Sequence, residues 1–256
     1  MSLLTTTDMS VTFGGLRAVN EVNLVVEEGS LVGLIGPNGA GKTTFIDGIT
    51  GFVPTSGRID LDGREISGLP ANRRAGLGLG RTWQSLELFD DLTVAENLQV
   101  AAERQSPRSF LADLVHPRRH REQGGVDYAL DVLDLEDLAT RMPNELSQGQ
   151  RKLVSAARAL AARPKLVCMD EPAAGLDTAE SQALGARLRR IIDAGITILL
   201  VDHDMGLVLG ISDHVVVLEF GKVIATGDPE AVRRDPQVVA AYLGKAAAAD
   251  IEEATT

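Results

Sequence analysis

The chain has 256 residues, 44% of them hydrophobic, which is enough for a sizeable core in one large or two small domains. Its formal net charge of -11 repels phosphate backbones and disfavours a nucleic-acid partner. The single cysteine, Cys168, excludes an intrachain disulfide, and the longest apolar runs fall far short of the roughly 20 residues of a membrane span. The N-terminus lacks the features of a secretion signal, so we expect a cytoplasmic protein that reaches a membrane only through a partner.

Short apolar runs predict strands of a sheet that is buried on both faces. They cover residues 31–35, 166–169, 196–201 and 215–218. Helical patterns over 42–49 and 178–192 alternate with these strands, which is typical of an α/β fold with parallel strands. From about residue 85 to 163 strand signals are few, and helical patterns cover 93–103, 126–133 and 147–162. We therefore predict a helical insert in an α/β core.

A glycine-rich loop follows the first of these strands. Residues 36–43 read GPNGAGKT and match the phosphate-loop pattern G-x-x-x-x-G-K-[ST]. The glycines allow backbone N–H groups to point at phosphates, and we expect Lys42 to reach the β- and γ-phosphates while Thr43 binds Mg²⁺. The predicted nucleotide-binding residues here are Gly36, Pro37, Asn38, Gly39, Ala40, Gly41, Lys42, Thr43 and Thr44. The loop alone leaves kinases, GTP switches, DNA motors and transport ATPases open.

Charged residues end two later strands at the same carboxyl edge of the sheet. Asp170 and Glu171 follow the apolar run at 166–169, and His203 follows the run at 196–201. We predict that Asp170 lies in the outer shell of Mg²⁺ and that Glu171 polarises the water that attacks the γ-phosphate. His203 would reach the same site.

The pentapeptide LSQGQ at residues 146–150 resembles the signature of ATP-binding cassette (ABC) proteins. Ser147 suits the N-cap of the following helix, and Gly149 lets the backbone approach an anion there. The full set of motifs resembles an ABC nucleotide-binding domain over residues 3–244. The set consists of the phosphate loop, Gln84, this pentapeptide, the acidic pair, residues 175–177 (GLD) and His203.

The resemblance implies a particular fold and assembly. The fold is an α/β P-loop NTPase (RecA-like) core with a mainly parallel sheet, an antiparallel β subdomain and a helical insert at about 85–163. The composition of the last residues separately predicts a flexible tail over 245–256. Two cassettes would form a head-to-tail dimer, in which ATP on one subunit's loop is capped by the partner's signature. The capping residues here are Ser147, Gly149 and Gln150.

The resemblance also assigns individual roles. Glu171 is the catalytic base, and His203 contacts the γ-phosphate. Gln84 senses both Mg²⁺ and the membrane subunit. Asp177 links the two ATP sites, and Phe13 stacks on adenine. The catalytic set is thus Glu171, His203, Gln84 and Lys42, and the Mg²⁺ set is Thr43, Gln84 and Asp170. Phe13 replaces a commoner tyrosine and Gln148 a commoner glycine, and neither change removes a required group.

Several stretches resemble the ATP-binding subunits of branched-chain amino acid importers. They read FGGLRAV, RTWQ, LFDDLTVAENL, DEPAAGLD, DHDMGLVLGISD and VVAAYLG. This likeness implies a second ATPase subunit, the same chain or a paralogue, with two membrane permeases and, indirectly, an extracytoplasmic solute-binding protein. The chain would then lie on the inner face of the cell membrane. Urea and amide importers share much of the pattern.

Other functions fit the sequence less well. A soluble ABC ATPase acting on DNA or ribosomes would usually carry long coiled coils or tandem cassettes, whereas this chain has one cassette, no heptad run and an acidic charge. A small-molecule kinase does not explain residues 146–150.

The basic segment 104–123 is open to two interpretations, a solvated loop or a contact with permease or anionic lipid headgroups.

Overall fold

The computed structural model describes residues 1–83, 88–103 and 123–243. The predictions for Gln84, for almost all of the basic segment 104–123 and for the tail 245–256 therefore lie outside the described residues. Among the helices of the described ranges, none is both long and apolar enough to cross a membrane.

A six-stranded sheet forms the centre of the fold, in the order β10-β9-β3-β8-β7-β6. Its strands are β3 (Leu31–Ile35), β6 (Leu79–Arg81), β7 (Leu166–Asp170), β8 (Thr197–Val201), β9 (His214–Glu219) and β10 (Lys222–Gly227). Every neighbouring pair is parallel except β9 and β10. All residues of β3, β7 and β8 are buried, because apolar side chains cover both faces of the sheet. The four predicted strands are confirmed.

A separate antiparallel sheet has the order β2-β1-β4-β5. Its strands are β1 (Ser2–Phe13), β2 (Leu16–Glu27), β4 (Ser56–Leu61) and β5 (Arg64–Glu65). Buried and exposed residues alternate along the second half of β2, so one face turns to the core. That face packs on α1 (Lys42–Thr50) in an apolar cluster that includes Met9, Val19 and Phe45. Only the family resemblance had implied this sheet.

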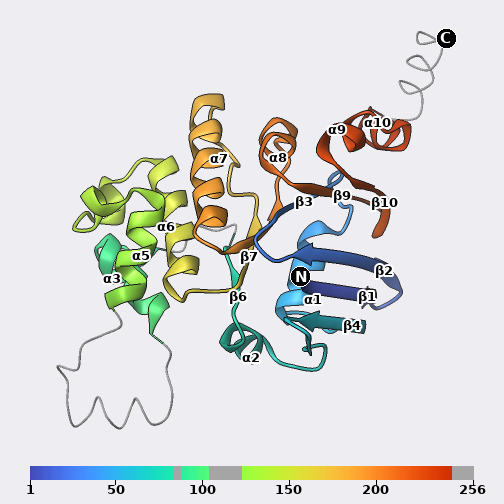
Figure 1. The fold of residues 1–256 in the computed structure, drawn as a ribbon, viewed down its shortest axis with the longest axis horizontal. Coiled ribbons are helices and arrows are strands. Elements are labelled where there is room, and N and C mark those ends of the chain that lie inside the picture. The colour runs from blue at the N-terminus through green and yellow to red at the C-terminus, as the bar shows by residue number, and fades with distance from the viewer. Residues whose placement is uncertain (84–87, 104–122, 244–256) are drawn as a thin grey trace.

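The remaining helices surround the central sheet (Figure 1). They are α2 (Ala71–Gly76), α3 (Val94–Ala102), α5 (Gln123–Leu133), α6 (Gln148–Ala161), α7 (Thr178–Asp193), α8 (Met205–Ile211), α9 (Pro229–Arg233) and α10 (Pro236–Leu243), with 3-10 turns at Glu136–Leu138 and Pro143–Glu145. The three helices α3, α5 and α6 pack on one another beside β7 and β6, to the left in Figure 1. They are the predicted helical insert, and α5 begins three residues earlier than its pattern indicated.

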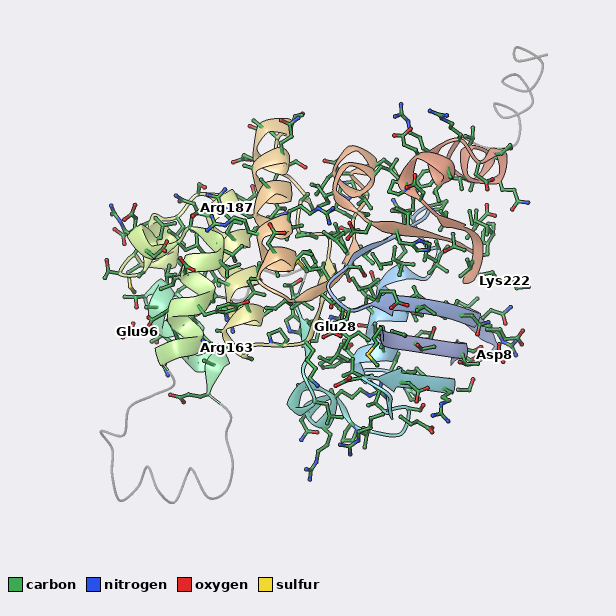
Figure 2. The ribbon with its side chains drawn as sticks, in the orientation of Figure 1. Asp8, Glu28, Glu96, Arg163, Arg187 and Lys222 are labelled. Atoms are coloured by element: carbon green, nitrogen blue, oxygen red, sulfur yellow. The ribbon has the colours of Figure 1, made fainter. Side chains whose placement is uncertain are left out.

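Contacts along α7 join the helical insert to the core. Arg187 on α7 lies towards α5 (Figure 2), and its Nε donates to the carbonyl of Leu133 at 3.0 Å. One apolar cluster also runs from Leu98 and Leu160 in the insert to Val167 on β7. The insert is therefore packed against β7, the strand that ends at the acidic pair.

Arg74 on α2 is a buried structural residue that the sequence patterns did not reveal. Its side chain is 3% exposed, and burial lowers the pKa of its guanidinium. The guanidinium donates to the carbonyls of Gly48 and Ile49 at 2.7 and 2.8 Å, and to those of Leu69 and Ser67 at 2.8 and 2.7 Å. Because the last carbonyls of α1 carry the negative end of its dipole, Arg74 caps the helix that starts at the phosphate loop.

We expect Arg74→Met to lower the free energy of unfolding by about 2–4 kcal/mol, because buried carbonyls lose a charged donor. Urea denaturation followed by circular dichroism measures this loss. The exposed neighbour Arg73 is the matched control, and Arg73→Met should change stability by less than about 0.5 kcal/mol. Equal effects of the two substitutions would show that the carbonyl contacts do not stabilise the fold.

Candidate functional site

The phosphate loop connects β3 to α1 and requires glycine at two positions. Gly36 and Gly41 have φ angles of 149° and 102°, where other residues are strained. A Cβ on Gly36 would lie 2.0 Å from the carbonyl oxygen of Leu218, and one on Gly41 would lie 2.4 Å from that of Ala18. The loop is thus packed against β9 and β2, and these contacts fix its shape.

The turn between β9 and β10 holds the loop from outside. The N–H of Gly221 donates to the carbonyl of Ala40 at 2.9 Å, and the N–H of Asn20 donates to the carbonyl of Gly221 at 2.8 Å. These bonds tie the central and antiparallel sheets together at the loop. Ordered amides at the start of a helix form a binding place for phosphate groups.

Lys42 lies across the phosphate loop with a largely buried side chain. Its ammonium donates to the carbonyl of Gly36 at 2.7 Å and to that of Pro37 at 3.1 Å. Burial lowers the pKa of Lys42, and the negative charges of Glu171 and Asp170 partly oppose this effect. Both predicted carboxylates therefore lie within electrostatic reach of the loop lysine, as the sequence predicted for the carboxyl edge of the sheet.

Asp170 and Thr43 together provide hard oxygen atoms next to the loop. The Thr43 hydroxyl donates to Asp170 Oδ1 at 3.4 Å, and Asp170 is 3% exposed. Burial raises the pKa of Asp170, although the Thr43 bond and the charge of Arg81 counteract it. A hydroxyl and a carboxylate beside a phosphate cradle fit Mg²⁺, which prefers oxygen ligands and shares its shell with phosphates. The third predicted ligand, Gln84, lies outside the described residues.

Glu171 adopts an uncommon backbone conformation directly after β7. Its φ is 51°, a left-handed value that costs a non-glycine residue roughly 1–3 kcal/mol. The N–H of Glu171 donates to the carbonyl of Val201 at 2.7 Å, which fixes the residue to the end of β8. Such strain is often found at catalytic positions, because it aims a side chain that regular structure would direct elsewhere.

Asp202 organises the turn that presents His203, and the sequence analysis had assigned it no role. It is 1% exposed and accepts bonds from the N–H groups of Ala173 at 2.8 Å and Asp204 at 3.0 Å. His203 Nδ1 lies 3.5 Å from Asp202 Oδ1, while 58% of the His203 side chain is exposed. Asp202 therefore joins the segment after Glu171 to the turn of His203. The signal was the run Asp-His-Asp directly after a buried strand.

The signature residues form a second group, at the N-terminus of α6. Ser147 is the N-cap, as predicted, and its hydroxyl accepts from the N–H of Gln150 at 3.2 Å. The Gln150 side chain accepts from the N–H of Ser147 at 2.9 Å, which completes a capping box. Asp177 caps α7 in the same way with Glu180. The starts of both helices are exposed, and the first turn of α6 carries no acidic residue.

Phe13 lies at the tip of the antiparallel sheet, where β1 turns into β2. Its side chain is 49% exposed, so a planar ring could stack on it.

The other described residues of the site form two groups. The phosphate loop, Asp170 and Glu171 lie at the edge of the central sheet, and Ser147, Gly149 and Asp177 lie at the starts of α6 and α7.

Comparison with known proteins gives consistent results. The family described as "ABC transporter" matches residues 19–174, and the one described as "Branched-chain amino acid ATP-binding cassette transporter" matches residues 222–248. The high-affinity branched-chain amino acid transport ATP-binding protein BraF of Pseudomonas aeruginosa is 44% identical over 95% of this chain and 98% of its own. The corresponding protein LivG of Escherichia coli K12 is 40% identical, with the same coverage.

Solved structures are similar over nearly the whole chain. A nucleotide-free ATP-binding cassette from an ABC transporter has a TM-score of 0.84 and 32% identity, over 95% of this chain and all of its own. The ADP conformation of the cassette MJ1267 has a TM-score of 0.83 and 33% identity, over 95% and 99%. The chain therefore belongs to the ABC transporter family, as one of its ATP-binding, ATP-hydrolysing cassettes.

Proposed function

We propose that this ATPase drives the import of branched-chain amino acids through separate membrane permeases, with Mg²⁺ as its metal cofactor. The observation that supports hydrolysis is the convergence of Lys42, Asp170 and Glu171 at the carboxyl edge of the sheet. The substrate class rests on the named relatives and on the family match at residues 222–248. Urea and amides remain the alternative substrates.

Transport in reconstituted vesicles tests this function. The chain would be purified with any permeases and binding protein that are encoded beside its gene. Uptake of labelled leucine, isoleucine, valine and urea would then be measured with and without ATP. We expect ATP-dependent uptake of the three amino acids. Uptake of urea alone would change the assigned substrate to urea. In the purification step, recovery of the chain with ribosomes or DNA instead of permeases would overturn the assignment as a transport ATPase.

The working unit would be a head-to-tail dimer of two cassettes. Each chain offers a phosphate loop with Glu171 for one ATP and an exposed helix start with Ser147, Gly149 and Gln150 for the other. Because the N-terminus of a helix attracts anions, the start of α6 is suited to the γ-phosphate of an ATP held by a partner. The partner cassette would be a second copy or a paralogue.

The permease would dock beside Trp83, where the helical insert meets the core, and would hold the chain at the inner face of the membrane. Trp83 and Phe52 are 46% and 52% exposed, and their rings meet edge to face at 4.7 Å. A cavity of about 230 Å³ is lined in part by Trp83, Arg81 and Arg158. Exposed aromatic rings and arginines are enriched in interfaces, and the resemblance assigns contact with the membrane subunit to Gln84, the next residue in the sequence.

We expect Trp83→Ser to weaken assembly with the permeases at least tenfold, because an aromatic anchor in an interface is commonly worth about 2 kcal/mol or more. Binding would be measured by titrating the labelled chain onto permease-containing nanodiscs. ATP affinity should stay unchanged. The control is Val25→Ser, which removes an exposed apolar side chain from the antiparallel sheet. If both variants assembled as well as the unmodified chain, this docking face would be wrong.

A further inference from the structure

Lys152 lies in the second turn of α6, just after the signature, but its contact is with the segment that follows Glu171. Its ammonium donates to the carbonyl of Ala174. The N–H of Ala174 in turn donates to the carbonyl of Glu171 at 3.2 Å. Two successive hydrogen bonds therefore connect the signature helix to the backbone of the proposed catalytic base.

Acidic groups from three elements lie within electrostatic reach of this ammonium. The charges of Asp202 after β8, Glu171 after β7 and Glu180 in the first turn of α7 all raise the pKa of Lys152, although its partial burial lowers that pKa more strongly. Asp202 also accepts from the N–H of Ala173, inside the same turn. The positive charge of Lys152 thus interacts with carboxylates that follow two strands and begin a helix, while its hydrogen bond goes to the carbonyl of Ala174.

The signature and this turn also fit closely in shape. A Cβ on Gly175 would lie 3.1 Å from the side-chain nitrogen of Gln148, and one on Gly149 would lie 3.3 Å from a carboxylate oxygen of Glu180. There is therefore little room for a side chain at either glycine, and the start of α6 lies close to the turn at 174–176 and to the first turn of α7.

These contacts join two parts that act on different nucleotides. In the proposed dimer, the start of α6 caps the ATP of the partner, whereas Glu171 serves the ATP on its own phosphate loop. We propose that Lys152 is a positioning residue that couples the two half-sites, by fixing the turn after Glu171 to the signature helix when that helix closes on the partner's ATP. This inference rests on the proposed function, in which Glu171 is the base.

The test is steady-state ATP hydrolysis by the assembled transporter. Lys152→Met should lower kcat at least tenfold while the KM for ATP stays within about twofold, because the phosphate cradle is intact and only the alignment of Glu171 is lost. Lys152→Arg, which keeps a cationic donor, should have a kcat of at least about half that of the unmodified protein. Lys165→Met is the control, since Lys165 is an exposed lysine that pairs with Asp62 away from the site.

Three results would overturn the proposal. They are a kcat of Lys152→Met within twofold of the unmodified protein, an arginine variant no better than the methionine one, and a change confined to KM. If the methionine variant fails to assemble, Lys152→Gln replaces it and the same three criteria apply.

A parallel measurement on Glu171→Gln separates this proposal from the function on which it rests. Hydrolysis that persists in Glu171→Gln would exclude Glu171 as the base and would contradict the proposed function. Hydrolysis that stops in Glu171→Gln but continues normally in Lys152→Met would remove only the coupling role of Lys152.

Discussion

Glu171→Gln is expected to slow ATP hydrolysis at least 100-fold while ATP affinity stays within about threefold, since a general base typically contributes 10²–10⁴-fold. The amide has nearly the same shape as the carboxylate but cannot accept a proton from the attacking water. The phosphate loop, Lys42 and Thr43 are untouched, so the nucleotide still binds. ATP that is bound but not cleaved should hold two cassettes together.

Two measurements check this expectation. Phosphate release gives the turnover rate, and size-exclusion chromatography with ATP and Mg²⁺ shows whether a dimer accumulates. Glu65→Gln is the matched control, because Glu65 is an exposed carboxylate on β5 that pairs with Arg58. Undiminished turnover in Glu171→Gln would exclude Glu171 as the base. A loss of ATP binding would instead show that the carboxylate supports the phosphate loop.

The sequence predicted the parts of the fold that follow from local chemistry. The phosphate-loop motif needs a strand before it and a helix after it, and β3 and α1 occupy those places. The charged groups after β7 and β8 could be assigned to one edge, because parallel strands in a sheet end on the same side. Ser147 was recognisable as an N-cap because capping depends on neighbouring residues alone.

The antiparallel sheet was not predictable from residue patterns. Along β1, alternation of apolar and polar residues is interrupted, since Thr6 is buried and Asp8 has a φ of 49°. The pairing of β1 with β2 shifts register between Thr6 and Met9, so β1 shows no regular period of two along its length. The short helix α8 was also missed, because glycines at 206 and 210 weaken its helical pattern.

The missed residues of the site share one feature, which is that they bind backbone groups far away in the sequence. Asp202 accepts from the N–H of Ala173, and Lys152 donates to the carbonyl of Ala174. Because nearly every residue carries such backbone groups, the residue type does not reveal which one binds the charged side chain. Only the folded chain shows which carbonyl or amide lies near a given charged side chain.

Lys42→Ala is expected to weaken ATP binding at least 100-fold, because truncating a charged partner of phosphate commonly costs about 2–5 kcal/mol. Calorimetric titration with ATP would measure the loss. The same substitution also removes the donor that holds the carbonyls of Gly36 and Pro37, so the melting temperature must be recorded in parallel.

Comparing nucleotides distinguishes a lost charge from a collapsed loop. If Lys42 acts on the β- and γ-phosphates, Lys42→Ala should weaken ATP and ADP binding strongly but leave the weaker binding of AMP nearly unchanged, because AMP lacks both groups. A collapsed loop would weaken all three nucleotides and lower the melting temperature. Equal ATP affinity in the variant and the unmodified chain would contradict the role of Lys42, and with it the assignment of residues 36–44 as the phosphate cradle.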